Sequence, residues 1–115
     1  MRLRDLQAQF IGNLAPDDSF ETLDVPFHKA QGVMFLCPKC FHTQGGHIGT
    51  HSVICWFRGR GVPDATLPGP GRWNPSGTGL DDLTFVGPEL TSVQLTGGCA
   101  WHGHIAQGEA LGDGA

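Results

Sequence analysis

The sequence predicts a mainly β domain of the β-rich α+β class: a small antiparallel sheet stapled by a zinc-ribbon-like Cys3His site, with a short N-terminal helix. Three observations predict it. The 115 residues include 18 Gly and 8 Pro, which interrupt helices. The apolar runs are short and rich in β-branched and aromatic residues, as in Val53–Phe57. Two cysteine motifs, Cys37-Pro38-Lys39-Cys40 and Cys99-Ala100-Trp101-His102, have the spacing of zinc knuckles.

The individual elements follow from local patterns. Leu3, Leu6, Phe10 and Leu14 recur at near-helical spacing and predict an amphipathic helix over 3–14. Apolar, β-branched and aromatic runs bounded by turn residues predict strands over 20–27, 33–36, 48–57, 83–86, 92–96 and 101–105. The strand at 33–36 leads directly into the first knuckle, so a buried strand is expected to deliver Cys37 to a tight turn.

The length fits a single zinc-binding domain over 1–115. We expect an N-terminal extension over 1–30, a long Gly/Pro loop over 59–79 and a peripheral tail over 107–115. Within the loop, Arg72 and Trp73 are candidate anchors. Two interpretations of the loop stay open, a cover for the core with Trp73 inserted in it and a lid over a binding site.

Charge and hydropathy exclude several classes of protein. The formal net charge of −4, with few and scattered basic residues, argues against a nucleic-acid-binding face. No apolar run is long enough to cross a membrane, and residues 1–5 lack the apolar segment of a signal peptide. A cytoplasmic location is therefore expected, where thiols stay reduced and paired cysteines bind metal more often than they form disulfides.

The predicted metal ligands are Cys37, Cys40, Cys99 and His102. Thiolates and imidazole are the ligands that Zn²⁺ prefers, and four protein ligands close its tetrahedron, so the zinc is expected to be structural and not catalytic. Two alternative ligands stay open. One is Cys55, although its position in an apolar strand is typical of a core residue, and the other is His42 in place of His102. Disulfide formation or simple burial is the alternative to metal binding.

Catalysis would need other groups. Ser, His and Asp can act as nucleophile, base and orienting group, and the candidates here are His51, Ser76, Ser92 and His104, with Asp81 and Asp82. No G-x-S-x-G motif is present. Each candidate also has a structural interpretation: an aspartate that caps a turn, a loop hydroxyl, or a hydrogen-bonded strand histidine.

Several motifs together resemble a known family, over residues 30–109. They are Phe35-Leu36-Cys37-Pro38-x-Cys40, Gly49-Thr50-His51-Ser52, Trp73-x-x-Ser76-Gly77-Thr78, Asp82-Leu83-Thr84 and Cys99-x-Trp101-His102-Gly103. The family consists of small phage and prophage proteins, largely of unknown function, whose wider relatives occur in bacterial ubiquitin-like operons and are regarded as peptidase-like.

The resemblance implies metal ligation by Cys37, Cys40, Cys99 and His102. It also implies functional positions at His51, Trp73, Ser76 and Ser92. Where the relatives often carry a Pro-Ser pair before the last strand, this chain has Thr91-Ser92.

Two functions are therefore expected. The first is a phage-encoded zinc-binding protein that acts as an interaction module for a phage or host protein, in the host cytoplasm or associated with the virion. The second is a small peptidase that cleaves a ubiquitin-like tail with Ser92 or Ser76 and His51 or His104.

Overall fold

A four-stranded antiparallel sheet forms the frame of the molecule. The computed structural model describes residues 1–14, 20–23, 25–63, 65–66, 71–87, 92–94 and 101–112. Within these residues the frame consists of β1 (Gln9–Leu14), β2 (Phe20–Leu23), β3 (Gly32–Leu36) and β4 (Ser52–Trp56), in the spatial order β2-β1-β3-β4. The strand predicted at 33–36 is confirmed. The strand predicted at 48–57 is shorter, because Thr50 N–H donates to the His47 carbonyl (3.1 Å) and closes a turn there.

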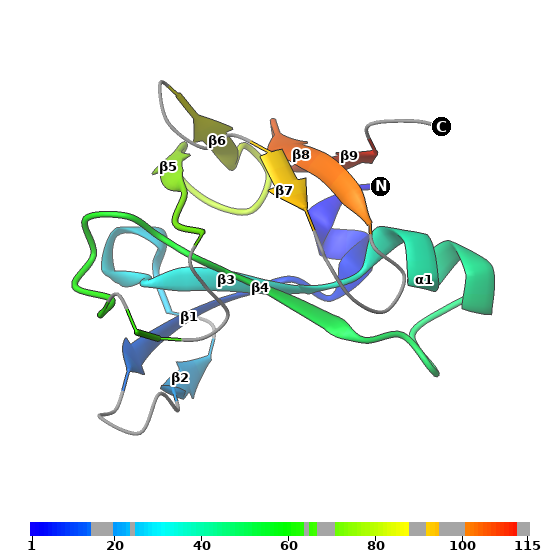
Figure 1. Cartoon of the computed structure of the whole chain (residues 1–115), viewed down its shortest axis with the longest axis horizontal. Helices are drawn as coiled ribbons and strands as arrows, with labels where there is room; N and C mark the ends of the chain where they lie inside the picture. Colours follow the sequence, from blue (N-terminus) through cyan, green and yellow to red (C-terminus); the bar gives the residue numbers. More distant parts are fainter. Residues whose placement is uncertain are drawn as a thin grey trace.

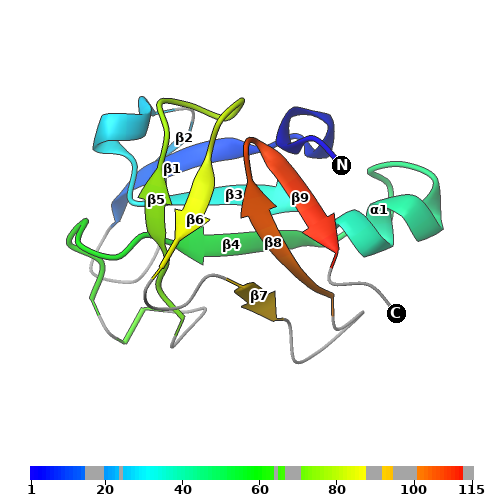
Figure 2. The same cartoon turned by 90° about the horizontal axis from the view of Figure 1, so that it is seen from above.

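Two smaller antiparallel sheets lie on one face of this frame (Figures 1 and 2). One pairs β5 (Asn74–Ser76) with β6 (Thr84–Val86). The other has the order β7-β8-β9, formed by β7 (Ser92–Gln94), β8 (His102–Ala106) and β9 (Glu109–Gly112). The described part of the chain is thus β-rich, with one short α-helix, α1 (Pro38–Gln44), which confirms the predicted fold class.

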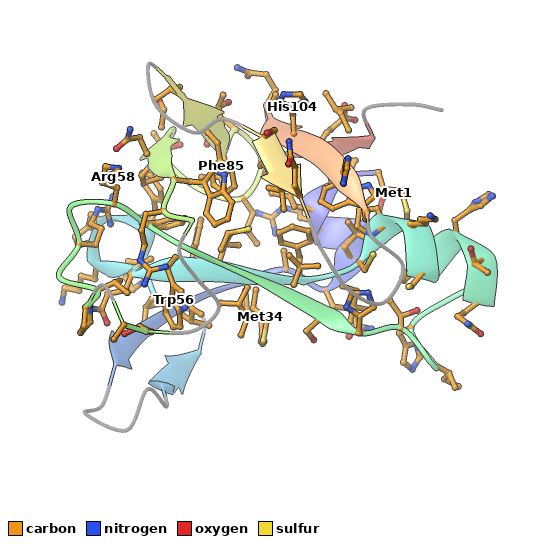
Figure 3. All side chains as sticks on the ribbon, viewed as in Figure 1. Met1, Met34, Trp56, Arg58, Phe85 and His104 are labelled. Carbon is orange, nitrogen blue, oxygen red and sulfur yellow. The ribbon has the colours of Figure 1, made fainter. Side chains whose placement is uncertain are left out.

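The main core lies between the frame and the smaller sheets. Side chains alternate along each strand, so Val33 and Phe35 on β3 share the inner face with Val53 and Cys55 on β4, and all four are buried. Figure 3 shows Phe85 on the inner side of the frame and Met34 and Trp56 on the outer side. Aromatic rings dominate this core and meet mostly edge to face, with centroid distances of 6.3 Å for Phe57–Phe85 and 6.2 Å for Phe35–Trp101.

The predicted helix over 3–14 is wrong in extent. A short N-terminal helix is present, but it is the 3-10 helix η1 (Leu3–Leu6), which ends where Gln7 adopts a left-handed conformation with φ of 54°. Leu3 and Leu6 are fully buried, since residues three apart lie on the same side of a 3-10 helix. The rest of the segment is β1, which pairs with β2 and β3 in the sheet.

The two ends of the described chain pair with each other (Figure 1). The Met1 amino group donates to the Ala110 carbonyl (2.9 Å), Ala110 N–H donates to the Met1 carbonyl (2.7 Å), and Leu3 N–H donates to the Gly108 carbonyl (2.9 Å). The stretch 107–115, expected to be peripheral, therefore contains β9, and Ala110 is buried. The N-terminal residues likewise contribute Leu3, Leu6 and Phe10 to the core.

The described part of the 59–79 segment supports the interpretation of a cover for the core. Trp73 lies on the frame: its N–H donates to the Trp56 carbonyl (3.1 Å), and its indole N–H donates to the Ser92 carbonyl (2.9 Å). Its ring stacks on Phe85, with 5.6 Å between centroids. Arg72 is buried and donates to the carbonyls of Pro63 (2.9 Å) and Thr66 (2.8 Å), which holds the loop against the sheet.

Candidate metal centre

The first knuckle is formed where β3 passes into α1. Cys37 is the N-cap of α1 and Pro38 occupies the first helical position, where its fixed φ and missing N–H are compatible with a helix start. Phe41 N–H donates to the Cys37 carbonyl (2.9 Å) and closes the first turn. Residues three apart are neighbours on a helical turn, so Cys37 and Cys40 lie on the same side of it.

A tight connection returns the chain from α1 to β4. Gly45 ends the helix with φ of 72°, and its N–H donates to the His42 carbonyl (3.3 Å). The hydroxyl of Thr50 donates to the Gly46 carbonyl (2.7 Å) and holds the following turn. The exposed residues of this connection include His47 and Ile48.

The β3–β4 register then places His51 opposite Cys37. The last pair in this ladder is Leu36 with Ser52, and one step further Cys37 N–H donates to the His51 carbonyl (2.9 Å). The position of His51 is thus fixed by the same sheet that delivers Cys37.

Cys37, Cys40 and His51 form a group with the geometry of a metal site. One ligand atom of each lies within 4.8 Å of the ligand atoms of the other two. In a tetrahedral zinc site, bond lengths of about 2.3 Å to sulfur and 2.0 Å to nitrogen put neighbouring ligand atoms about 3.5–3.8 Å apart. The three side chains therefore fit a metal ion after small adjustments. Cys37 is buried, Cys40 is half-buried and His51 is exposed, so one side of the site faces solvent.

The other predicted ligands have different positions. Cys99 lies outside the described residues. His102 is exposed on β8 and is not one of the three residues in the group. His42 is exposed on α1 and is not in the group either. The Cys99 and His102 assignments stay predictions.

Cys55 has the environment of a core residue. It is fully buried on β4, and this burial raises the pKa of its thiol far above the ordinary value, so it stays protonated where a metal ligand would be a thiolate. Cys37, Cys40 and Cys55 are the three cysteines in the described part of the chain, and no disulfide joins any two of them.

The structure brings two of the four catalytic candidates together. His51 is elsewhere, in the metal group with Cys37 and Cys40. Ser76 is exposed on β5, opposite Thr84. Ser92 and His104, by contrast, are directly opposite each other in the β7–β8 ladder. The sequence indicated both as catalytic candidates but did not indicate that they are neighbours.

The two aspartates have structural roles. The Asp82 carboxylate accepts hydrogen bonds from Thr78 N–H (2.8 Å), Gly79 N–H (2.9 Å) and the Thr78 hydroxyl (3.0 Å), and these donors lower the pKa of Asp82. Asp81 accepts a hydrogen bond from the Arg4 guanidinium, which lowers its pKa and ties the turn to the N-terminus. The interpretation that an aspartate caps a turn is confirmed for Asp82.

Among the described residues, no helix is both long and apolar enough to span a membrane. Comparison with protein-family models, with curated proteins and with solved structures found no match to this chain.

Proposed function

We propose that this protein binds one zinc ion through Cys37, Cys40 and His51, with Cys99 as the fourth ligand. The proximity of the first three side chains carries the proposal. Two thiolates and one imidazole are a donor set that favours zinc over the harder Mg²⁺ and Ca²⁺, which prefer oxygen ligands.

The neighbours of Cys99 in the sequence support its part in the site. Trp101 follows Cys99 by two residues and is buried against Phe35, which precedes Cys37 by two residues; the two ring centroids are 6.2 Å apart. Two residues of chain span at most about 7 Å. The two-residue separation of Cys99 from Trp101 therefore supports Cys99 as the fourth ligand, whereas His102 belongs to the exposed face of β8.

The role proposed for the ion is structural. It would join the end of β3, the start of β4 and the segment that precedes β8, which are distant in the sequence. Structural zinc sites in small peptides contribute about 10–16 kcal/mol of apparent binding free energy at neutral pH. A typical domain has a net stability of about 5–15 kcal/mol. Removal of the metal is therefore expected to unfold this chain.

We further propose that the protein is a phage-encoded interaction module. A zinc ion with four protein ligands has no open position for a substrate, which favours a binding role over metal catalysis. The connection between α1 and β4, next to the site, carries Ile48 with 79% of its surface exposed, and this residue is the candidate contact for a phage or host protein.

Elemental analysis and cobalt substitution test the metal site. We expect near one zinc per purified chain and, after exchange, the charge-transfer and d–d bands of tetrahedral thiolate-bound cobalt. Cys99→Ser should weaken the thiolate charge-transfer band, because one of three thiolates is lost, while His47→Ala should leave the spectrum unchanged. A folded, metal-free protein that is indifferent to chelator would refute the site. An unchanged spectrum in Cys99→Ser would remove Cys99 from it.

A peptidase is the second candidate function, and one observation favours it: Ser92 and His104 face each other across β7 and β8. Side chains directly opposite in an antiparallel ladder have Cβ atoms about 4.5–5.5 Å apart, within reach of a serine–imidazole pair. The test is hydrolysis of a fluorogenic peptide with a ubiquitin-like C-terminal tail. Loss of hydrolysis in Ser92→Ala and His104→Ala, but not in the matched Ser76→Ala, would support the peptidase. No hydrolysis by the metal-loaded wild type would rule it out.

A further inference from the structure

A cavity lies at the end of β3 opposite to the metal centre. It has a volume of about 660 Å³ and is lined by Pro26, Phe27, His28, Arg60, Gly77 and Thr78. Phe27 and His28 belong to the 3-10 helix η2 (Phe27–Lys29), which precedes β3, whereas the cysteines follow β3. In Figure 2, η2 and α1 accordingly lie at opposite ends of this strand. The volume is within the range of about 300–1,000 Å³ that is typical of small-molecule sites.

Arg60 is held rigidly at this cavity. One of its terminal nitrogens, Nη1, donates to the carbonyls of Phe27 (2.9 Å) and Ala30 (2.7 Å), which uses both of its hydrogens. The guanidinium carbon lies 5.2 Å from the ring centroid of Phe27 and 5.7 Å from that of Phe57. The Arg60 carbonyl in turn accepts a hydrogen bond from the Gln31 side chain (3.1 Å). Little side-chain entropy is left to lose when a ligand binds.

The charge of Arg60 is not neutralised by an acidic side chain in the part of the chain that the structure describes. The ion pairs there join Arg2 and Arg4 to Asp81. Because Nη1 serves the two carbonyls, the Nε–Nη2 edge of the guanidinium is the pair of donors that can take a further partner. Two parallel N–H groups on one edge match the two oxygens of a carboxylate.

The other residues that line the cavity indicate the chemical character of the rest of the ligand. Pro26 and Phe27 supply apolar surface, and His28 adds an imidazole with hydrogen-bonding nitrogens. Thr78 donates both its N–H and its hydroxyl to Asp82, whose carboxylate thus has three donors of its own. The net charge of −4 disfavours a dianion such as phosphate relative to a monoanion.

We propose that this cavity binds the carboxylate of an organic acid with an apolar or aromatic body, through the Nε–Nη2 edge of Arg60. The carboxylate belongs either to a free small acid or to the C-terminus of a peptide. The site is independent of the zinc site, and neither requires the other.

The test is an NMR titration of the metal-loaded protein with benzoate and with the neutral isostere benzamide. We expect saturable shifts with benzoate at the Arg60 Nε–H signal and at the amides of Phe27, His28 and Thr78, and none with benzamide. Arg60→Lys keeps the positive charge but loses the two parallel N–H donors. It should weaken benzoate binding at least about tenfold, as expected for loss of a charge-assisted hydrogen bond. Arg58→Gln, the control for diffuse attraction to a nearby cation, should bind benzoate like the wild type.

N-acetylphenylalanine distinguishes the two sources of the carboxylate. Tighter binding than benzoate would indicate a peptide C-terminus, and weaker binding a free acid. The proposal is overturned if benzamide shifts the same signals as benzoate, or if the Arg60 Nε–H signal of the wild type does not move. The titrations of the wild type with benzoate and benzamide test the proposed carboxylate site even if Arg60→Lys fails to fold.

Discussion

The Cys37 N–H donates to the His51 carbonyl at 2.9 Å, which makes these two residues the continuation of the β3–β4 ladder. The first turn of α1 brings Cys40 to the same place. One local turn and one long-range pairing thus assemble three candidate ligands. If the fourth is Cys99, the ion would connect the end of β3, the first turn of α1, the residue before β4 and the segment that precedes β8.

Replacing His51 and His102 one at a time tests which of these two histidines binds the metal. We expect His51→Ala to lower zinc affinity by at least about tenfold, because a ligand is lost, and His102→Ala to bind zinc like the wild type. Competition with a coloured chelator at neutral pH measures both affinities. The reverse ranking would show that His102 is the ligand and that His51 lies beside the ion without binding it.

The rate of alkylation should distinguish Cys40 from Cys55. The thiolate is the form that reacts, and burial both shields Cys55 and raises the pKa of its thiol. In the folded protein, without chelator, iodoacetamide should therefore modify the half-buried Cys40 well before Cys55, as peptide mass spectrometry can follow. Protein unfolded in denaturant, where all cysteines react, is the control. Modification of Cys55 first would contradict its assignment to the core.

Gly103 is required by the packing of Trp101. A Cβ at Gly103 would overlap the Trp101 indole and the Leu111 carbonyl, and the carbonyl belongs to a paired strand that cannot easily move. We expect Gly103→Ala to lower the free energy of unfolding by about 1–3 kcal/mol, as overpacking does. Gly79→Ala is the matched control, because a Cβ there meets nothing within 4 Å, and it should stay within about 0.5 kcal/mol of wild type. Urea denaturation of the metal-loaded proteins measures both, and equal values would be inconsistent with the Trp101 packing.

Asp82 should make the free energy of unfolding depend on pH in the acid range. Hydrogen bonds from Thr78 N–H, Gly79 N–H and the Thr78 hydroxyl lower the pKa of the folded-state carboxyl below its ordinary value of 3.8. Its contribution is therefore complete above that value and is lost as the pH falls through the lower folded-state pKa. We expect the stability difference between wild type and Asp82→Asn to be largest at neutral pH and to shrink below pH 3.8.

Acid would also release the ion of the proposed metal site, but it would do so in both proteins, so the difference between their unfolding curves isolates Asp82. The exposed Asp5→Asn variant provides the control. A difference that does not change with pH would show that the Asp82 charge does not matter to the fold.

The sequence was most informative where the signal was local. The C-x2-C spacing of Cys37 and Cys40 correctly indicated two neighbouring thiols on one turn, with the geometry of a possible metal site, and the apolar run at 33–36 correctly predicted the strand before it. The helix predicted over 3–14 was wrong because Leu3, Leu6, Phe10 and Leu14 fit a helical period by spacing alone. Pairing of Gln9–Leu14 with two neighbouring strands overrode that period.

His51 could have been found as a candidate ligand by one further step of sequence reasoning. Pairing the run at 33–36 with that at 53–56 as antiparallel strands, with the knuckle and α1 between them, brings residue 37 beside residue 51. The register of a strand pair is a property of two segments, and neither segment specifies it alone. Without it, His51 was interpreted as a candidate base.

The sequence by itself therefore determined the β-rich class, the proximity of the two cysteines in the first knuckle and the burial of the alternating apolar positions, since each depends on residues close together in the chain. Tertiary structure decided which histidine joins Cys37 and Cys40, that Ser92 faces His104, that the chain ends pair, and that Arg60 is fixed at a cavity. These are contacts between distant segments. They arise only when the sheets pack, because register and burial, not local preference, set the distances between such residues.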